Sequence, residues 1–348
     1  MIGAKDEKGN KVATRTGINA IATNFYKELY DSNAQRGDES VKEIKGEDED
    51  EIPAILKREV EEAINNLKSN KTPGEDGILN EYLKWGKEEL LESITSLFNK
   101  IIRSENIPQQ WYKSSIVLLH KKGNRDDLNN YRPISLMSII YKVFMKILTN
   151  RITRRLDENQ PPEQAGFRSS FSTMDHLQTI NQLIEKTQEY NMTVYMAFID
   201  YKKAFDSVEH NSVMTALEVM GTHPKYVRLI RKIYKNSKAK VKTEFEGETF
   251  RMKKGVRQGD PISPKLFTSV LEIIFRKVKW TKNNYGININ GRRLSNLRFA
   301  DDIVLFATSA KKLEKMMNEL NDKSKEVGLN MNPMKTKLMT NSTENPPS

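Results

Sequence analysis

The sequence predicts an α+β fold, and two kinds of pattern support this prediction. Apolar residues recur at helical spacing over long stretches, for example from Glu88 to Arg103 and from Met174 to Tyr190. Short runs rich in β-branched residues, such as Ser115 to His120 and Val194 to Ile199, are typical of buried strands. Arg298 to Phe306 reads R-F-A-D-D-I-V-L-F, and the apolar runs on both sides of its acidic pair predict a β-hairpin.

Composition limits the class of protein. The chain has 348 residues, of which 37% are hydrophobic and 30% charged, enough for one large domain or two to three subdomains. A net charge of +11 and a pI of about 9.4 favour a polyanionic partner, either nucleic acid or an anionic membrane surface. No stretch approaches the roughly 18 apolar residues of a membrane span, and the first residues lack a signal-peptide pattern. The absence of Cys excludes thiolate metal sites, and four His argue against a histidine-rich zinc site, so carboxylates would have to hold any metal.

The charge is unevenly distributed along the chain. The acidic run Glu47 to Glu51 is typical of a solvated linker. Basic residues gather later, where a solvated face and a phosphate-binding surface are the alternatives, and their place beside the candidate chemistry favours phosphate-backbone binding. These basic residues are Lys225, Arg228, Arg231, Lys232, Lys235, Lys238, Lys240, Lys242, Arg251, Lys253, Lys254 and Arg257.

The N-terminal part is predicted to contain helices with polar connections. Thr16 to Tyr30 has an amphipathic pattern, and Pro53 can open the next helix. The segment Lys68 to Ile78, K-S-N-K-T-P-G-E-D-G-I, carries strong turn signals. It is either a basic loop that approaches a nucleic-acid backbone or a plain surface loop.

A group of basic residues follows the first predicted strand, Ser115 to His120. Lys121 and Lys122 lie in the turn after it, and Asn130 to Leu136 then runs into a long helical pattern. Lys provides a mobile positive charge, and Arg can donate two parallel hydrogen bonds to one phosphate. The two lysines and Arg132 are therefore well suited to bind a triphosphate.

A candidate acid follows the strand Val194 to Ile199, which ends at Asp200. Asp206 is the competing candidate. The hydrophobic strand delivers Asp200 to the edge of the core, whereas Asp206 falls in the turn that starts the next helix and suits a helix cap.

The remaining elements are predicted from periodicity and turn residues. Gly255 to Pro264 is a loop in which Gly259 allows close backbone approach to a ligand and Gln258 offers an amide donor and acceptor. The other predicted elements are a short loop from Glu163 to Arg168, helices from Ser212 to Met220, Pro224 to Lys235, Lys265 to Lys279 and Lys311 to Val327, a hairpin from Ala239 to Met252 that turns at Gly247, and a loop with a short strand from Gly328 to Lys337.

Three carboxylates form the candidate centre, with Asp301 and Asp302 on the hairpin and Asp200 at a strand end. Like charges on a buried tip repel, so a divalent cation is their natural partner and Mg²⁺ prefers carboxylate oxygen, while a solvated turn is the alternative. Such a set suits two metal ions that activate an attacking oxygen and neutralise a leaving phosphate. Phosphoryl transfer otherwise depends mainly on basic side chains that bind and position the phosphates, called clamps below. The candidate clamps are Lys121, Lys122, Arg132 and Lys335. The lack of Cys, G-x-S-x-G and P-loop patterns argues against nucleophilic hydrolases and P-loop NTPases.

Seven ordered motifs, found between Ile52 and Thr340, resemble those of a reverse transcriptase of the non-LTR (LINE-type) retrotransposons. Four of them resemble palm motifs: F-I-D-Y-K-K-A-F-D-S-V, G-V-R-Q-G-D-P-I-S-P-K-L-F, R-F-A-D-D-I-V-L-F and G-L-N-M-N-P-M-K-T-K. H-K-K-G-N-R-D-D-L-N-N-Y-R-P-I-S-L resembles the fingers motif, E-Q-A-G-F-R the motif between fingers and palm, and K-T-P-G-E-D-G-I the upstream motif of this branch.

The resemblance implies a right-hand polymerase palm with an antiparallel sheet and mainly helical fingers. It places an upstream linker at residues 1–51, fingers with an N-terminal extension at 52–190, the palm at 191–340 and a disordered tail at 341–348. It implies a nuclear or cytoplasmic RNA-directed DNA polymerase that binds an RNA template, a DNA primer, dNTPs and two Mg²⁺ ions, with Mn²⁺ as the alternative ion and no membrane. Family members carry an endonuclease domain and a thumb as well, so we expect a fragment with weak or non-processive synthesis.

Residue roles are implied at the matching positions. Asp200, Asp301 and Asp302 would bind the two metal ions, the backbone from Tyr201 to Ala204 would line the triphosphate, and Phe205 would lie under the sugar and exclude a 2′-hydroxyl. For Phe205 the alternative is an ordinary core residue, and for Lys335 it is a solvated lysine. The other implied contacts are Lys121 or Lys122 and Arg132 on the triphosphate, Gln258 and Gly259 on the nucleotide and template, and Lys335 as proton donor to pyrophosphate.

Three other functions stay open at this point. The first is a catalytically inactive or domesticated copy that binds nucleic acid, which the intact Asp200, Asp301 and Asp302 argue against. The second is a metal-dependent nuclease, which the order of the palm motifs disfavours. RNA-directed RNA synthesis is disfavoured by Phe205, because a small residue is expected where a 2′-hydroxyl must be accepted.

Overall fold

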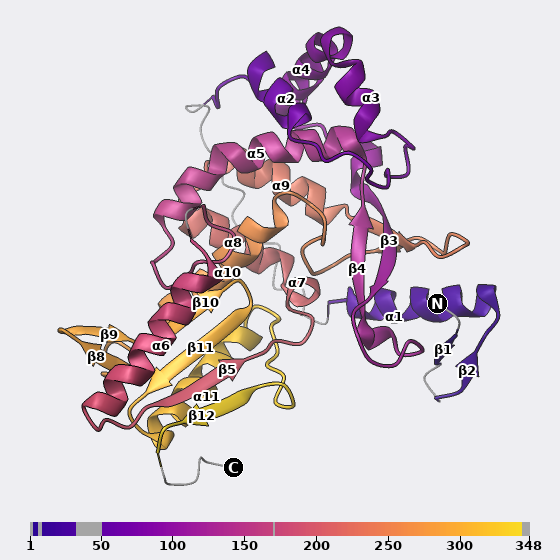
Figure 1. Ribbon diagram of the computed structural model, residues 1–348. Coiled ribbons are helices and arrows are strands. Elements are labelled where there is room, and N and C mark those ends of the chain that lie inside the picture. Colours follow the sequence, from indigo (N-terminus) through magenta and orange to yellow (C-terminus); the bar gives the residue numbers. More distant parts are fainter. Residues whose placement is uncertain (1–2, 6–8, 33–50, 170, 343–348) are drawn as a thin grey trace. The chain divides into compact units, whose positions relative to one another are not determined.

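The computed structural model describes residues 3–5, 9–32, 51–169 and 171–342, which form two compact units (Figure 1). The first unit combines Met1–Arg154 with Glu209–Ser263, and the second combines Arg155–Val208 with Pro264–Ser348. Each unit is therefore built from two separate stretches of chain. Both units draw residues from each side of position 190, where the sequence placed the end of the fingers, and that domain boundary stays a prediction.

The first unit contains a mixed four-stranded sheet in the order β4-β3-β6-β7. Strand β3 pairs antiparallel with β4 and parallel with β6, and β6 pairs antiparallel with β7. The strands are β3 (Lys113–His120), β4 (Tyr131–Leu136), β6 (Lys238–Val241) and β7 (Phe250–Arg251), next to a small hairpin of β1 (Ala4–Lys5) and β2 (Lys11–Val12).

Helices complete the first unit. They are α1 (Arg15–Leu29), α2 (Lys57–Asn65), α3 (Asn80–Trp85), α4 (Lys87–Ser104), α8 (His210–Val219) and α9 (Pro224–Lys235), with α5 (Ile139–Glu158) running past the end of the unit at residue 154. Short 3₁₀ helices cover Gln109–Tyr112 and Leu128–Asn130. An aromatic cluster forms the core between α4 and α5, where the ring of Phe98 lies 6.2 Å from that of Trp111 and 5.2 Å from that of Phe144.

Helix α1 is part of the core of the first unit. Ala22 and Tyr26 of α1, and Tyr30 directly after the helix, are buried in one cluster with Ile116 of β3 and Val241 of β6. Residues 1–51 were expected to be a linker that contains this helix, and α1 packs on the sheet because its apolar stripe covers one sheet face. The acidic run, apart from Glu51, lies outside the described residues.

The second unit is built on an antiparallel sheet in the order β10-β11-β5-β12. Its strands are β5 (Tyr195–Ile199), β10 (Asn296–Phe299), β11 (Asp302–Ala307) and β12 (Lys337–Thr340), and β8 (Ile287–Ile289) forms a separate hairpin with β9 (Arg292–Leu294). Its helices are α6 (Thr173–Glu189), α7 (Ala204–Ser207), α10 (Ser263–Lys277) and α11 (Ala310–Lys325). Helix α6 covers one face, where Leu183 packs with Met196 and Phe306, and α11 packs on the other face (Figure 1).

Several local predictions need correction. The helix after Pro53 begins only at Lys57, where Leu56 is the N-cap residue and the side chain of Glu59 accepts a hydrogen bond from the Leu56 amide at 2.9 Å. Residues 131–136 lead into helix α5, as expected, but they form strand β4, which was not predicted; Pro133 is tolerated there because β4 is an edge strand. Asp206 lies inside the short helix α7 and does not cap the next helix, whose N-cap is Glu209.

The described C-terminal end is tied to the loop before β5. Asn341, the first residue of the predicted disordered tail, accepts a hydrogen bond from the Val194 amide at 2.9 Å and donates one to the Met192 carbonyl at 2.9 Å, so the order extends at least to this residue. Residues 343–348 lie outside the described residues.

Within the described ranges, the structure contains no helix with the length and apolar character of a membrane span.

Candidate active site

Two of the predicted acids lie opposite each other on neighbouring strands. Ile199 at the end of β5 pairs with Ile303 of β11, so the antiparallel register places Asp200 across from Asp302. Burial raises the pKa of the Asp302 carboxyl above its ordinary value, and the charge of Asp200 raises it further. The sheet thus fixes two repelling carboxylates side by side, as the sequence predicted for Asp200 in preference to Asp206.

The loop after α11 holds the backbone around Asp200. The amide of Asn332 donates to the Asp200 carbonyl at 2.7 Å, and its side-chain amide donates to an Asp200 carboxylate oxygen at 3.2 Å. The amide of Lys202 donates to the Asn330 carbonyl at 2.9 Å. This loop belongs to the motif G-L-N-M-N-P-M-K-T-K, so two motifs far apart in the sequence meet at the first acid.

Asp301 lies in the tight turn between β10 and β11, and this turn needs an unusual backbone. Ala300 has a positive φ of 58°, the left-handed conformation that L-residues rarely adopt. The side chain of Gln164 accepts a hydrogen bond from the Ala300 amide at 3.2 Å. Gln164 is not among the predicted site residues, because no local pattern signals a partner in a distant hairpin.

The acids offer the ligands of a hard divalent cation, although they do not by themselves form a closed metal cage. Among the described residues, no three carboxylate or histidine side chains converge as a metal-binding group. Mg²⁺ is usually bound through one or two carboxylates, with substrate phosphates and water completing the shell. The facing carboxylates of Asp200 and Asp302, with Asp301 beside them, fit this open arrangement, because a cation would offset the repulsion that raises the pKa of Asp302.

A buried ion pair lies under the strand that leads to the turn. Arg298 of β10 and Glu272 of α10 are joined at 3.1 Å, and their side chains are 2% and 6% exposed. The guanidinium of Arg298 also lies 4.1 Å from the ring centre of Phe275. Burial lowers the pKa of Arg298, while Glu272 acts to raise it. The first residue of R-F-A-D-D therefore anchors the hairpin in the core.

Phe205 lies in an aromatic stack. Its ring is 4.5 Å from that of Phe267 at an angle of 17°, and the ring of Phe167 meets it edge-on at 6.2 Å. The neighbouring Tyr201 is buried, its hydroxyl is 2.7 Å from that of Ser324, and burial raises its pKa to about 12. Because this side chain is occupied in the core, only the backbone of Tyr201 remains for a ligand, as the resemblance implies.

The predicted triphosphate and template residues lie in the first unit. Lys121 and Lys122 are exposed at the end of the β3–β4 hairpin, where the Lys121 amide donates to the Asn130 carbonyl at 2.9 Å, and Arg132 is exposed on β4. The Gln258 carbonyl accepts a hydrogen bond from the Ser135 amide of β4 at 2.8 Å.

Gly259 completes this contact with β4. It has a φ of 107°, and a Cβ there would lie 3.0 Å from the carbonyl oxygen of Ser135. Only glycine therefore fits without strain, and the loop lies against the strand that carries Arg132.

Buried polar residues support the loop that holds Gln258. Arg257 is 1% exposed and donates to the Tyr112 carbonyl at 3.1 Å and to the Ser237 hydroxyl at 2.7 Å. The hydroxyl of buried Tyr141 donates to the Asp260 carboxylate. Arg257 and Asp260 are thus structural, and Gln258 and Gly259 between them are presented by a rigid frame.

Lys335 is exposed in the turn that follows Asn332, where its amide donates to the Asn332 carbonyl at 3.1 Å. The structure brings Asp200, Asp301, Asp302, Tyr201, Phe205 and Lys335 into the second unit, and Lys121, Lys122, Arg132, Gln258 and Gly259 into the first.

Six of the twelve residues of the predicted basic surface are paired with acids or buried within the fold. Arg228 pairs with Glu105 at 2.7 Å and Lys232 with the same carboxylate group at 3.2 Å, while Arg257 is buried. The other ion pairs are Arg231 with Glu218, Lys240 with Glu75 and Glu246, and Lys253 with Asp31. Phosphate binding by the cluster stays a prediction. Some of the pairing acids, such as Glu105 and Glu75, come from distant segments and were not visible as neighbours in the sequence.

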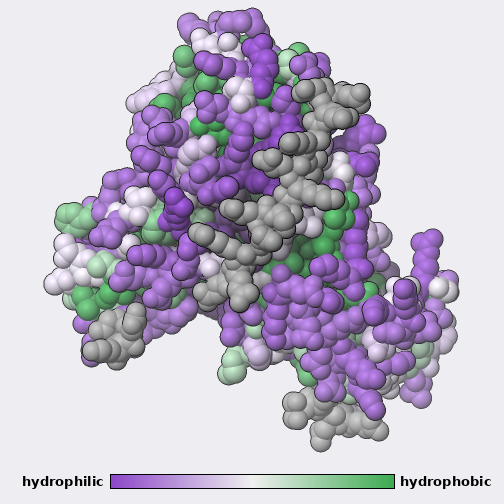
Figure 2. Space-filling view, turned by 180° about the vertical axis from the view of Figure 1, so that it is seen from behind, coloured by the Kyte–Doolittle hydropathy of each residue, from purple (hydrophilic) through white to green (hydrophobic). Residues whose placement is uncertain are grey.

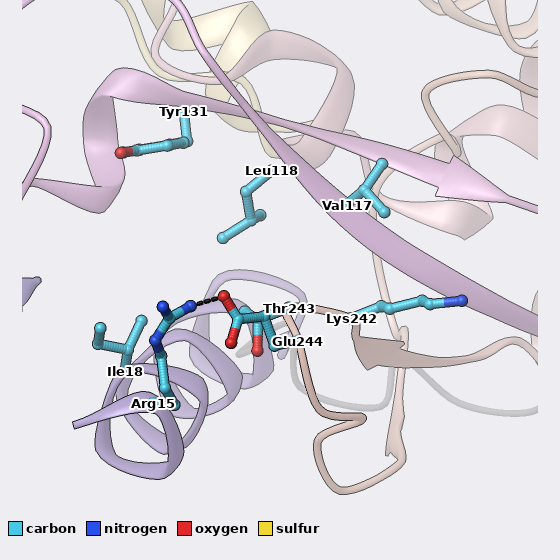
Figure 3. Close-up of a pocket in the computed structure, with 8 residues that line it drawn as sticks. All are labelled: Arg15, Ile18, Val117, Leu118, Tyr131, Lys242, Thr243 and Glu244. Carbon is cyan, nitrogen blue, oxygen red and sulfur yellow. Dashed lines mark ion pairs between the residues drawn. The ribbon is translucent and has the colours of Figure 1, made fainter. Parts of the chain in front are cut away.

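The surface and one pocket of the first unit lie apart from the predicted acids. The face in Figure 2 is mainly hydrophilic, with scattered apolar patches. A pocket of about 240 Å³ lies between α1 and the sheet of the first unit, and Arg15 forms an ion pair with Glu244 at its rim (Figure 3). Its lining contains none of the predicted site residues; it consists of Arg15, Ile18, Val117, Leu118, Tyr131, Lys242, Thr243 and Glu244.

Comparison with known proteins gives a consistent result. A family model described as reverse transcriptase (RNA-dependent DNA polymerase) matches residues 119–345. The chain is 32% identical over 247 residues to a Pol polyprotein from the type-1 retrotransposable element R2 of Nasonia vitripennis, covering 70% of this chain and 23% of that protein. It is 28% identical over 295 residues to a probable RNA-directed DNA polymerase from transposon BS of Drosophila melanogaster, covering 82% of this chain and 32% of that protein.

A solved structure has a similar fold. Apo telomerase from Candida tropicalis, truncated from its C-terminal domain, matches with a TM-score of 0.52 and 14% identity, over 72% of this chain and 56% of that one. This identity supports a likeness of fold alone. The chain spans between about a quarter and a third of the length of the two curated relatives.

Proposed function

Because this chain belongs to the reverse transcriptase family and is homologous to the RNA-directed DNA polymerases of non-LTR retrotransposons, we infer that it forms a catalytic core that copies RNA into DNA. The observation that carries the proposal is the placement of Asp200 opposite Asp302 on paired strands, with Asp301 in the adjoining turn. Rigid strands hold the carboxylates ready, which avoids the cost of arranging them during reaction.

The proposed reaction is nucleotidyl transfer. The 3′-hydroxyl oxygen of a DNA primer forms a bond to the α-phosphorus of a dNTP, the bond to the bridging oxygen of pyrophosphate breaks, and the hydroxyl proton leaves to solvent. When bound to Asp200, Asp301 and Asp302, two Mg²⁺ ions would supply activation of the attacking oxygen and charge neutralisation at the leaving group. Lys335 is the proposed proton donor to pyrophosphate.

The remaining residues bind and select the substrate in this proposal. Lys121, Lys122 and Arg132 hold the triphosphate by charge and hydrogen bonds. Phe205, held by its stack on Phe267, lies under the sugar and disfavours a 2′-hydroxyl. Contacts to the base and the RNA template are assigned to Gln258 and Gly259.

Primer extension tests this function directly. Purified chain is incubated with an RNA template, an annealed DNA primer, dNTPs and Mg²⁺, beside the variant Asp301→Ala. Extension by the wild type and none by the variant is expected. If the folded wild type binds the template–primer but does not extend it, the chain is a nucleic-acid-binding copy without catalysis. Cleavage of the template without dNTPs would indicate a nuclease instead.

A further inference from the structure

The turn that presents the acids is held by a segment to which the proposed mechanism gives no role. Residues 163–165 run beside β10 and form a parallel bridge between Gln164 and Arg298. The Arg298 amide donates to the Glu163 carbonyl at 2.7 Å, and the Ala165 amide donates to the Arg298 carbonyl at 2.9 Å. The motif E-Q-A-G-F-R therefore extends the sheet by a short fifth segment at the hairpin that carries Asp301.

The side chain of Gln164 connects this segment to the turn itself. Its Oε1 accepts hydrogen bonds from the Gly166 amide at 2.9 Å and from the Ala300 amide at 3.2 Å. The Ala300 amide thus gains a partner although its residue has left-handed backbone angles, which are unfavourable for a non-glycine residue. A hydrogen bond to this amide favours the strained turn over relaxed alternatives.

The amide nitrogen of Gln164 indicates that this position is used for its oxygen. Gln164 is 0% exposed, and its Nε2 has no hydrogen-bond partner within the described residues. A buried amide without a partner disfavours the folded state. An apolar side chain would remove this cost but would leave the Gly166 and Ala300 amides without their acceptor, so the polar residue is explained by what Oε1 does for the turn.

The backbone of Gly166 lies directly against the backbone of Ala300, with no room for a side chain between them. A Cβ on Gly166 would lie 2.1 Å from the Ala300 nitrogen and 2.8 Å from its Cα. Both are backbone atoms that cannot move aside independently of the turn. Gln164 and Gly166 together therefore determine where Ala300 lies, and with it the two acids that follow.

We propose that Gln164 is a positioning residue for the catalytic turn. Its Oε1 fixes the Ala300 peptide so that Asp301 and Asp302 are held opposite Asp200 when metal and nucleotide bind. The role rests on the proposed polymerase function and acts through the acids without contact to substrate. Loss of Oε1 should therefore lower kcat and raise the Mg²⁺ concentration for half-maximal rate, while the KM for dNTP changes little.

The test compares three single variants in the full chain. Gln164→Met keeps the length of the side chain and removes the acceptor, Gln164→Glu restores an oxygen acceptor, and Leu183→Ala destabilises the core of the same unit away from the turn. We expect kcat to fall about tenfold in Gln164→Met, a difference of about 1.4 kcal/mol in activation free energy. Activity should return to within about threefold of wild type in Gln164→Glu.

A second readout does not depend on activity. Hydrogen exchange of the Ala300 amide, followed in a peptide covering residues 298–303, should accelerate in Gln164→Met and remain protected in Gln164→Glu and Leu183→Ala. The proposal is overturned if Gln164→Met retains wild-type kcat and wild-type protection, or if Leu183→Ala reproduces its loss of kcat. A wild type without polymerase activity would reject the proposed function, whereas the exchange result would still decide whether Gln164 holds the turn.

Discussion

Asp302 lies directly across from Asp200 in the central pair of antiparallel strands, and burial and the charge of Asp200 together raise the pKa of the Asp302 carboxyl. We expect Asp302→Asn to abolish primer extension and yet raise the free energy of unfolding at neutral pH. The gain is on the order of 0.5 kcal/mol, because Asp302 is exposed enough for solvent to screen the repulsion. Urea titrations without metal measure it.

The pH dependence has a defined sign. The pKa of Asp302 is raised in the folded state, so its favourable contribution is full below the ordinary carboxyl pKa and is lost as the pH rises through the raised value. The stabilising effect of Asp302→Asn should therefore appear above that pH and vanish in acid. A gain that persists at pH 3 would contradict this explanation.

Gly166→Ala should damage the turn, because the new methyl group would overlap the Ala300 backbone. The expected cost is about 1–3 kcal/mol of folding free energy, as for other overpacked positions, together with a fall of about tenfold in extension rate. Gly291→Asn in the β8–β9 turn is the matched control. Its φ is 85° with no atom within 4 Å of a new Cβ, and Asn tolerates this conformation, so unfolding should change by less than about 0.5 kcal/mol.

Glu272→Met should destabilise the second unit by about 3–5 kcal/mol, because it leaves the Arg298 charge buried without its partner. The double variant with Arg298→Met should lose much less than the sum of the single losses, which a double-mutant cycle in urea would show. Arg276→Met removes the half-exposed partner of the same carboxylate and should cost under about 1 kcal/mol. Additive losses in the cycle would count against direct coupling of the buried pair.

Phe205→Val should admit ribonucleotides. If Phe205 lies under the sugar as proposed, removing its ring makes room for a 2′-hydroxyl, so the ratio of ribonucleotide to deoxyribonucleotide incorporation should rise at least about tenfold, or about 1.4 kcal/mol. Single-nucleotide extension with each substrate measures the ratio. Unchanged discrimination would assign Phe205 to the core alone.

His210 should make stability depend on pH in the range from 6.5 to 4. Burial lowers its pKa to about 4, and its Nε2 donates to the Gly255 carbonyl at 2.9 Å. A depressed pKa means that this stability is complete above the ordinary value of 6.5 and is lost as the pH falls through about 4, a total of about 3 kcal/mol. His210→Gln should flatten this part of the stability profile, and an unaltered slope would exclude His210 as its source.

The sequence predicted the long helices closely, because periodic apolar residues report the face that a helix buries. The prediction of Pro224 to Lys235 matches α9 at both ends. Short strands with a mixed pattern were harder: β4 contains Pro133, and β8 and β9 are missing from the prediction although Asn290-Gly291 between them is a strong hairpin signal.

The positions of the acids could be predicted from the sequence, but the residues that hold them in place could not. Asp200, Asp301 and Asp302 each follow or begin a hydrophobic strand, which is a local pattern. The contact from Gln164 to Ala300 and the pairing of Arg228 with Glu105 join residues more than a hundred positions apart, and nothing beside either residue marks the partner. Such contacts follow from the tertiary fold alone.

The pairing of β5 with β11 has a consequence for how the chain is made. Ile199 leaves the ribosome long before Ile303 and Leu338, which belong to the two strands that flank β5 in the sheet. At about 5–20 residues per second, the nascent β5 waits several seconds with both edges open. A translational pause or a premature stop before β11 would leave a hydrophobic strand that can pair with another nascent chain, so we expect truncated products to aggregate more readily than the full chain.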